Sequence, residues 1–325
     1  MDFLRFLEGL RIPVLNEVML AITYLGDEVA FLAIALVLFW CVDKRHGYYI
    51  MSVGFLGTIT TQFMKLMCRI PRPWVQDKNF TILEQAREGA GGYSFPSGHS
   101  QSSVGTFGSL AVIADRKWIR WLAVAVAVLV PFSRMYVGVH TPADVLVGSA
   151  VALALVFAVR PIIYNNDGKY FPWLIGFMVL IAVGYLCYVE CYPFPADIDL
   201  HNLESGTSNA YTLLGALLGL IPVYIVDKKW LQFPTKAVWW VQIIKTVVGL
   251  AIVLVLKSLL KDTLNVLFGE LPGRAVRYFL IVLFGGIAWP MTFKHLAKLD
   301  GNSVREFFLA MARIFKRICK LDNEE

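Results

Sequence analysis

The chain has 325 residues, of which 57% are hydrophobic and 17% carry a charge. Soluble domains carry charge on roughly a quarter of their residues, so this composition excludes an ordinary soluble domain and predicts an integral membrane protein. The net charge of +6 fits basic loops on one side of a bilayer. We therefore expect the membrane, and no nucleic acid, as the partner of these basic residues.

Residues 1–15 predict a short helix at the membrane surface. They lack the basic start, apolar core and cleavage site of a signal peptide. Apolar side chains gather on one side of a helical projection, and Pro13 ends the pattern. The side chains concerned are Phe3, Leu4, Phe6, Leu7 and Leu10. A helix of this kind lies in the interface with its apolar side in the bilayer.

Nine apolar runs follow that are long enough to cross the hydrocarbon core, which takes about 20 helical residues. We therefore expect an all-α fold, a polytopic membrane helix bundle with about nine transmembrane helices. The runs cover residues 17–41, 48–69, 98–115, 119–137, 143–164, 171–189, 207–226, 237–257 and 276–294.

The loops on the two sides of these spans differ in their basic residues. One side carries 17 of the 30 Lys and Arg residues, and basic residues are enriched in cytoplasmic loops. That side comprises the loops 43–45, 115–120, 160–169 and 227–236 and the tail from Lys294 onward. We therefore expect a multi-pass protein of the cell membrane, with the N-terminus outside or lumenal and the C-terminus cytoplasmic.

The second apolar run ends in two basic residues, Lys65 and Arg72. Pro71 and Pro73 prevent the helix from continuing, so both cations should lie at the outer mouth of the bundle. The alternative reading of this segment by itself is an outer loop whose basic side chains extend to the membrane surface.

The third run opens with Ser97, Gly98 and His99. Ser97 is a suitable N-cap, and Gly98 lets a ligand approach the free amides of the first turn. Such amides bind phosphate, and His99 would lie beside the anion. A capped membrane helix that carries a histidine by chance is the alternative.

Between the fourth and fifth runs lie Arg134, His140 and Asp144. Charged and ionisable residues are costly at a membrane edge and are usually functional there. Thr141 and Pro142 predict a helix start, from which the carboxylate of Asp144 can reach back to the imidazole of His140. A carboxylate that holds a histidine makes it a better base or nucleophile. The alternative is again a capped helix with an interfacial histidine.

The predicted topology places all three segments on the same side of the membrane. In this order, they resemble the three signature motifs of the type 2 phosphatidic acid phosphatase (PAP2) and vanadium haloperoxidase superfamily, in its membrane-bound phosphatase branch. The resemblance covers about residues 59–148 and fills every motif position. It implies a PAP2-like catalytic helical core within the bundle.

The resemblance also implies roles for the motif residues. His140 would be the nucleophile that takes the phosphoryl group, Asp144 would orient it, and His99 would protonate the leaving oxygen and later activate water. The residues that would hold the phosphate oxygens are Lys65, Arg72, Ser97, Gly98 and Arg134. No metal-ligand spacing is visible in the sequence, so we expect neither a metal nor another cofactor.

An active site at the bilayer edge favours a phosphorylated lipid substrate, such as phosphatidate, a polyprenyl diphosphate or a sphingoid-base phosphate. We therefore expect a phosphoric ester or diphosphate hydrolase that acts through a phosphohistidine at the outer or lumenal face. A phosphatase for a soluble substrate such as a sugar phosphate is the alternative among enzymes. A transporter whose basic mouth binds phosphorylated solutes is the alternative outside enzymes.

The sequence divides into three parts by these criteria. Residues 1–164 hold the catalytic membrane domain together with the N-terminal interfacial helix, and residues 165–296 add further transmembrane helices that carry no recognisable motif. Residues 297–325 alternate apolar and basic side chains at helical spacing. This tail predicts a basic amphipathic helix on the cytoplasmic leaflet.

Overall fold

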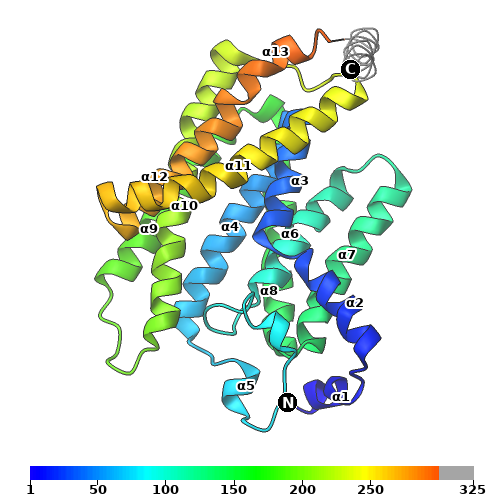
Figure 1. The fold of residues 1–325 in the computed structure, drawn as a ribbon, viewed down its shortest axis with the longest axis vertical. Coiled ribbons are helices and arrows are strands. Elements are labelled where there is room, and N and C mark those ends of the chain that lie inside the picture. The colour runs from blue at the N-terminus through cyan, green and yellow to red at the C-terminus, as the bar shows by residue number, and fades with distance from the viewer. Residues whose placement is uncertain (300–325) are drawn as a thin grey trace, which may run out of the picture.

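The computed structural model describes residues 1–299, and the predicted amphipathic tail lies almost entirely outside them. Within these residues every regular element is a helix and no strand occurs, which confirms the all-α fold. Figure 1 shows a bundle with α1 and α5 at one end and α13 at the other. The helices are α1 (Asp2–Gly9), α2 (Pro13–Tyr24), α3 (Glu28–Cys41), α4 (Lys44–Cys68), α5 (Pro73–Gln76), α6 (Gly98–Ile113), α7 (Lys117–Tyr136), α8 (Pro142–Tyr164), α9 (Phe171–Cys191), α10 (Leu200–Val226), α11 (Trp239–Phe268), α12 (Glu270–Leu283) and α13 (Phe293–Leu296).

Short 3-10 and π segments join or extend several of these helices. They are η1 (Glu84–Ala86), η2 (Asn165–Gly168), η3 (Asp227–Leu231), η4 (Phe284–Ala288) and η5 (Pro290–Thr292). The π segment η4 continues α12 toward α13, so this part of the chain forms one apolar helical stretch from Glu270 to Leu296.

All nine apolar runs are helical, but the expected number of nine spans is not confirmed. Six helices in residues 1–299 are long and apolar enough to cross a membrane, or seven if α2 and α3 together count as one span. α6 has only 16 residues. α4 has 25 residues, but Thr, Gln, Gly and Tyr side chains interrupt its apolar sequence. Both helices pack in the middle of the bundle, where neighbouring helices rather than lipid surround them.

The first apolar run, expected as one span over 17–41, is two helices. α2 and α3 meet at an angle of 50°, because Gly26 and Asp27 interrupt the apolar sequence at the bend. A Cβ atom on Gly26 would lie 2.8 Å from a side-chain carbon of Val130 and 3.3 Å from the Cβ atom of His99. Only glycine allows the bend to approach α6 and α7 this closely.

α4 is the central helix of the bundle. It packs against α3, α6, α8, α9 and α10, and its buried face includes Tyr49, whose hydroxyl donates a 2.7 Å hydrogen bond to the carbonyl of Val156 on α8. α6 lies between α4, α7 and α8. This arrangement brings the ends of α4 and α7 and the starts of α6 and α8 to one end of the molecule.

α9 to α12 form a second group of helices beside α4. α10 packs against α9, α12 and α4, and α11 runs obliquely across the bundle to contact α3 and α12 (Figure 1). α10 and α12 approach very closely: a Cβ atom on Gly215 would lie 2.0 Å from the carbonyl oxygen of Ala275. Tight contact of this kind is typical of membrane helix pairs that meet at small residues.

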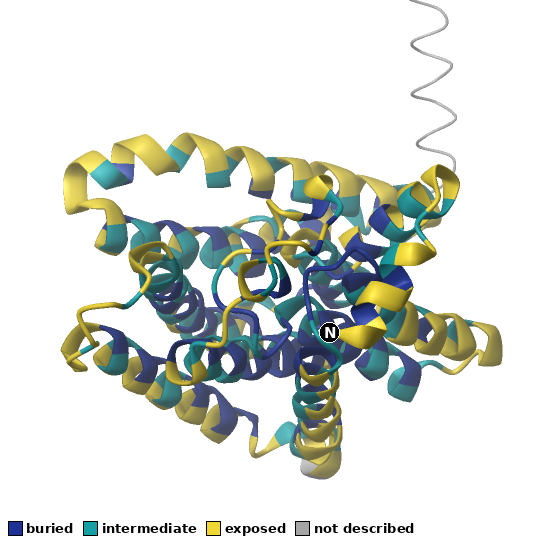
Figure 2. Ribbon diagram, turned by 90° about the horizontal axis from the view of Figure 1, so that it is seen from below, coloured by how far each residue is buried: buried dark blue, intermediate teal, exposed yellow. Residues whose placement is uncertain are grey.

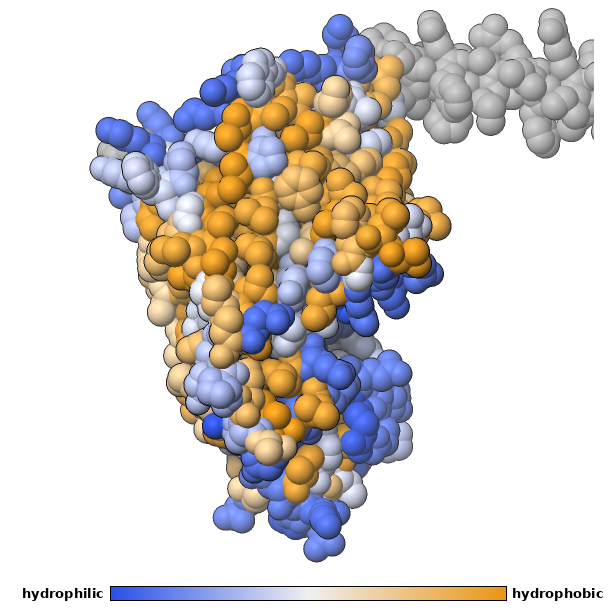
Figure 3. Space-filling model, turned by 90° about the vertical axis from the view of Figure 1, so that its left-hand side faces the viewer, coloured by the Kyte–Doolittle hydropathy of each residue, from blue (hydrophilic) through white to orange (hydrophobic). Residues whose placement is uncertain are grey.

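The outer surface of the bundle is apolar over most of its height. Figure 3 shows hydrophobic side chains over the middle and upper part of one face, with hydrophilic side chains gathered at the two ends. Large apolar side chains are exposed on α7, α9 and α11, among them Trp121 at 69%, Trp173 at 79% and Val266 at 86%. An exposed apolar belt of this extent is expected where helices face lipid.

The N-terminal helix forms as predicted, but its apolar residues do not share one environment. Leu4 and Leu7 are buried in the protein, whereas Phe3 and Phe6 are exposed. α1 ends at Gly9, before Pro13, which was expected to end the helix. Pro13 is instead the first residue of α2. The guanidinium of Arg11, between the two helices, donates to the carbonyl of Tyr136 at the end of α7.

Candidate active site

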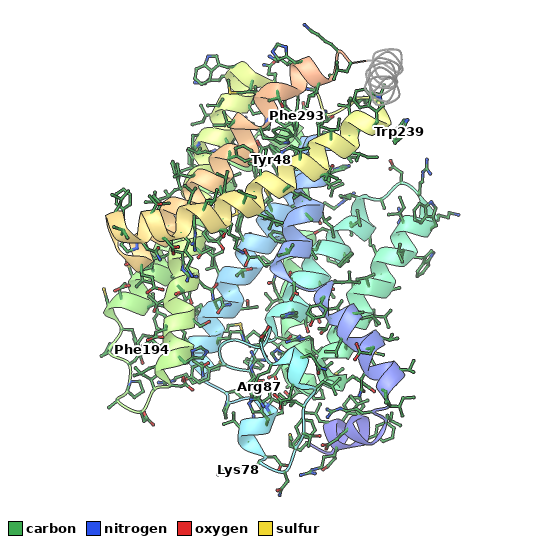
Figure 4. All side chains as sticks on the ribbon, viewed as in Figure 1. Tyr48, Lys78, Arg87, Phe194, Trp239 and Phe293 are labelled. Atoms are coloured by element: carbon green, nitrogen blue, oxygen red, sulfur yellow. The ribbon has the colours of Figure 1, made fainter. Side chains whose placement is uncertain are left out.

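The three motif segments meet at the end of the bundle that carries α1 and α5. Seen from that end, buried segments occupy the centre and exposed helix surfaces surround them (Figure 2). Figure 4 labels Arg87 and Lys78 in the loop at this end, and Trp239 and Phe293 at the opposite end. Six of the eight predicted site residues are buried: Lys65, Arg72, Ser97, Arg134, His140 and Asp144. Gly98 and His99 are partly exposed.

Asp144 is fixed at the start of α8 by a complete capping box. Its carboxylate accepts from the backbone N–H of Thr141 at 2.7 Å, and the Thr141 hydroxyl accepts from the N–H of Asp144. The same carboxylate oxygen accepts from the hydroxyl of Ser94 at 2.6 Å. It lies 3.5 Å from Nδ1 of His140. The carboxylate therefore faces the imidazole, as the sequence predicted, while its hydrogen bonds hold it in place.

The other ring nitrogen of His140 accepts a hydrogen bond from Arg72. Nη1 of Arg72 lies 2.8 Å from Nε2 of His140, and a guanidinium can only donate. Nε2 therefore carries the lone pair and Nδ1 carries the hydrogen; Nδ1 lies 3.5 Å from the Asp144 carboxylate without a hydrogen bond to it. This is the tautomer in which Nε2 can act as a nucleophile.

Burial and the neighbouring cations lower the pKa of His140 well below its ordinary value of 6.5. Burial is the largest cause, followed by the positive charges of Arg72, Arg134 and Lys65. At neutral pH the imidazole is consequently uncharged, which is the form a nucleophile requires. Burial also lowers the pKa of Arg72, to about 10, so the guanidinium keeps its charge at neutral pH.

Backbone carbonyls of the loop before α6 hold two of the cations. Arg72 donates to the carbonyls of Gly91 and Gly92 and, across the site, to that of Val139. The ammonium of Lys65 donates to the carbonyl of Tyr93. Neither cation is paired with a carboxylate in residues 1–299. Their positive charge is therefore available to an anionic group in the site.

Ser97 and Gly98 form the start of α6 as the sequence predicted. The Ser97 side chain caps the helix by accepting from the backbone N–H of Ser100. A Cβ atom on Gly98 would meet nothing within 4 Å, so the first turn of α6 is open on this side. An open helix N-terminus with free amides favours anions.

The bend between α2 and α3 supplies two contacts that the sequence did not predict. The carboxylate of Asp27 lies 2.6 Å from Nε2 of His99, and the hydroxyl of Thr23 accepts from Nη1 of Arg134 at 3.2 Å. Arg134 also donates to the carbonyl of Gly89 at 3.4 Å. The sequence feature that could have indicated the contact with His99 is Asp27, which follows Gly26 inside an otherwise apolar run. No sequence feature indicated that Ser94 would contact Asp144 or that the carbonyls of residues 89–93 would hold the cations.

Arg72 and Gly91 line two different cavities. An apolar cavity of about 380 Å³ extends through the bundle and is lined at one end by Lys65, Arg72, Gly98, His99 and His140. A second, open cleft of about 800 Å³ has charged and polar residues such as Arg69, Arg87 and His201 in its lining. It lies between the loop 69–93 and the loop before α10, and Arg72 lines it as well. Ser97, Arg134 and Asp144 do not line the apolar cavity, and Asp144 contacts His140, which does. Arg72 is the predicted site residue that lines both spaces.

The site has the chemistry of an anion pocket built from protein groups. No three His, Cys, Asp or Glu side chains within residues 1–299 are grouped so that they could hold a metal ion. Three cations and the N-terminus of α6 surround a neutral imidazole and a second histidine. Such a set can bind a phosphoryl group, supply a nucleophile and supply a proton.

Comparison with known protein families assigns both halves of the chain. Residues 45–168 match the PAP2 superfamily, and residues 211–302 match the transmembrane extension of PAP2 superfamily phosphatases. The first match covers every predicted site residue, and the second covers α11, α12 and most of α10. No solved structure matches the chain.

Three curated proteins resemble the catalytic half. The undecaprenyl-diphosphatase BcrC of Bacillus subtilis is 31% identical over 150 residues, which cover 44% of this chain and 72% of the relative. The phosphatidylglycerophosphatase B of Bacillus subtilis is 29% identical over 161 residues, covering 46% of this chain and 76% of the relative. An undecaprenyl-diphosphatase of Sulfolobus acidocaldarius is 30% identical over 139 residues, covering 42% and 66%. The chain belongs to the PAP2 superfamily and is a phosphoric ester or diphosphate hydrolase of that superfamily.

Proposed function

We propose that the protein is a membrane phosphatase that hydrolyses a phosphorylated lipid through a phosphohistidine on His140. The observation that carries this proposal is that Arg72 of the cationic site lines both the apolar cavity and the open cleft that contains further charged residues. A phosphorylated lipid matches both spaces, because its head group is charged and its chain is apolar. Lipid phosphates are also the substrates named for the three relatives: undecaprenyl diphosphate for two of them and phosphatidylglycerophosphate for the third.

In the first half of the reaction, Nε2 of His140 attacks phosphorus. The P–N bond forms while the bond between phosphorus and the leaving oxygen breaks, and His99 gives its proton to that oxygen. Asp144, 3.5 Å from Nδ1 of His140, stabilises the positive charge that develops on the ring. The lipid product leaves as an alcohol or as a lipid monophosphate.

In the second half, His99 takes a proton from a water molecule as the water oxygen attacks the phosphohistidine. The P–N bond breaks, inorganic phosphate leaves, and the lone pair returns to Nε2 of His140. Each histidine ends in its starting state, so the cycle needs no redox partner.

The cations stabilise the charge on the transferring phosphoryl group. Arg72 already donates to Nε2 of His140, and a phosphate oxygen would accept this hydrogen bond when phosphorus approaches the nitrogen. Lys65 and Gly98 line the same cavity as Arg72 and His140, and we assign the buried Arg134 and Ser97 hydroxyl to the same phosphoryl group. Preorganised donors of this kind stabilise charge that develops in the transition state.

Release of inorganic phosphate from purified protein in detergent tests this proposal. Wild type should release phosphate from a polyprenyl diphosphate or a phosphatidate-type lipid, and His140→Ala should not. Glu17→Gln, a change at an exposed residue of α2, is the matched control and should retain activity. Phosphate release from glucose 6-phosphate but from none of the lipids would favour the soluble-substrate alternative and contradict a lipid phosphatase.

We also propose that the active site faces the outside or lumenal side, because the predicted topology assigns the loops and the tail rich in Lys and Arg to the opposite side of the membrane. With native cysteines replaced, a cysteine placed in the loop 77–88 should react with an impermeant reagent in intact cells. A cysteine placed at residue 298, near the other end, should react only after lysis. The reverse labelling pattern would put the active site in the cytoplasm.

A further inference from the structure

We propose that the transmembrane extension forms a binding site for the hydrocarbon chain of the substrate, with the far end of that site at Gly285. The family matches assign the extension to the family but give it no task. The inference rests on the proposed lipid phosphatase function and deepens it, because it says which helices hold the chain and where its length is limited.

The apolar cavity has walls from both halves of the protein. α3 and α4 line one side, and α10, α11, α12 and η4 line the other. The wall from the extension includes Leu213, Leu220, Val253, Ile281 and Val282. The catalytic residues Lys65, Arg72, His99 and His140 line the same cavity. A chain in this cavity would therefore be continuous with a head group at the catalytic site.

The lining of α10 changes from polar to apolar along the helix. Ser205, Asn209 and Thr212 line the cavity at the end near the catalytic site, and Ala216, Leu220 and Val223 line it further along. The amide of Asn209 and the hydroxyl of Thr212 donate to carbonyls of their own helix, those of Ser205 and Ser208. This change from polar to apolar lining matches a lipid that is bound with its head group at the catalytic end and its chain further along α10.

The cavity is also elongated. Its lining on α10 runs from Ser205 to Val223, which corresponds to about 27 Å at the helical rise of 1.5 Å per residue. On α3 the lining runs from Glu28 to Phe39, about 16 Å by the same rise. An elongated apolar space of this kind fits a single extended chain better than a compact apolar group.

Gly285 and Gly286 of η4 line the far end of the cavity. The indole of Trp40 donates to the carbonyl of Gly285 at 2.8 Å, which fixes the backbone there. A Cβ atom on Gly285 would make only ordinary contacts, at 3.8 Å to Leu36 and 3.9 Å to Trp40. A Cβ atom on Gly286 would lie 2.4 Å from Val223. A larger side chain can therefore be added at position 285 but not at position 286. At position 285 it would shorten the cavity.

Gly285→Leu tests whether the far end limits chain length. We compare kcat/KM for a long-chain polyprenyl diphosphate, a short-chain prenyl diphosphate and a water-soluble aryl phosphate. We expect a loss of about tenfold or more on the long chain, the size of a steric discrimination in an apolar pocket. We expect values within about twofold of wild type on the other two substrates.

Gly176→Leu is the matched control. Gly176 lies on α9, a Cβ atom on it would meet nothing within 4 Å, and it does not line the cavity. This variant should leave all three values unchanged. An equal loss on all three substrates in Gly285→Leu, or no loss on the long chain, would overturn the chain-binding site.

A labelling experiment makes the test independent of turnover. A long-chain lipid diphosphate with a photoreactive group at the end of its chain is bound to His140→Ala, and the crosslinked peptides are identified. We expect labelling of residues 284–288 or of Leu36 and Phe39 on α3. Labelling confined to the exposed faces of α7 and α9 would overturn the site. Failure of the wild type to release phosphate from any lipid would overturn the phosphatase function, whatever the crosslinking pattern.

Discussion

The catalytic half of the bundle, α4 to α8, and the extension, α10 to α12, contribute different chemistry to the cavity that they share. In the catalytic half, charged and polar side chains are buried and fixed by capping and by loop carbonyls, as Asp144 and Arg72 show. The extension contributes mainly aliphatic side chains and glycines to the cavity that the two halves share. The comparison leads us to place the reaction on the catalytic half and the proposed limit on chain length on the extension. Changes in the first half should affect every substrate, and changes in the second should depend on the lipid chain.

The largest effect is expected at the nucleophile. His140→Ala should reduce phosphate release from every substrate by about 10⁴-fold or more, because the atom that attacks phosphorus is gone. Asp144→Asn should retain at least about tenfold more activity than His140→Ala, because it weakens only the orientation and charge stabilisation of the ring. Steady-state rates on lipid and aryl phosphates measure both. Equal residual activity in the two variants would contradict the assignment of the nucleophile.

A smaller effect that depends on the leaving group is expected at Asp27, which lies outside both family matches. Asp27 contacts His99, so Asp27→Asn should weaken proton transfer to the leaving oxygen. We expect a loss of about tenfold or more on an alkyl lipid phosphate, within the range of general acid catalysis. The loss on an aryl phosphate should be small, because an aryl leaving group departs without protonation. Equal losses on the two substrates, with Glu17→Gln unchanged, would show that Asp27 has only a structural role.

A change in pH dependence is expected when a cation near His140 is removed. The positive charge of Lys65 helps to lower the pKa of His140, so Lys65→Met should raise that pKa. A nucleophile must be unprotonated, and kcat/KM falls as pH drops through the pKa of the free enzyme. The acid limb of kcat/KM should therefore lie at higher pH in the variant than in wild type. An unchanged acid limb would contradict the electrostatic account of His140.

No effect is expected from the removal of metal ions. The phosphoryl group is proposed to be held by Arg72, Lys65 and Arg134 rather than by a divalent cation, so a chelator should leave phosphate release intact on all substrates. Vanadate, which can adopt the five-coordinate geometry of the transferring phosphorus, should inhibit competitively. Full inactivation by chelator that added divalent metal restores would contradict the proposed pocket.

Much of the catalytic half was predictable, because its chemistry requires polar residues at positions that an apolar sequence makes conspicuous. Pro71 and Pro73 end a helix, Ser97 caps the next, and Thr141 with Asp144 caps a third. The predicted topology put all three segments on one side, and the structure brings them together. The convergence of Lys65, Arg72, His99 and His140 on one cavity was therefore expected from the sequence.

The bend between α2 and α3 and the apolar cavity could not be predicted, because they depend on tertiary contacts. The bend at Gly26 and Asp27 is hidden when hydropathy is averaged over a run of 25 residues, so residues 17–41 were expected to form one span. The expected count of nine spans is not confirmed: within residues 1–299, six or seven helical segments are long and apolar enough. α6 is too short for this, and polar residues interrupt α4. The apolar cavity left no sequence pattern, because its lining comes from six helices, from η4 and from loop residues.

The measurement that tests the account most directly is the trapping of the phosphoenzyme in His99→Ala. With an activated aryl phosphate, His140 should still attack phosphorus, but the variant lacks the base that activates water. The account predicts that a single turnover leaves acid-labile phosphate on the peptide that contains His140, at close to one phosphate per active site. Intact substrate binding without any phosphoenzyme, or phosphate on another residue, would contradict the roles given to the two histidines.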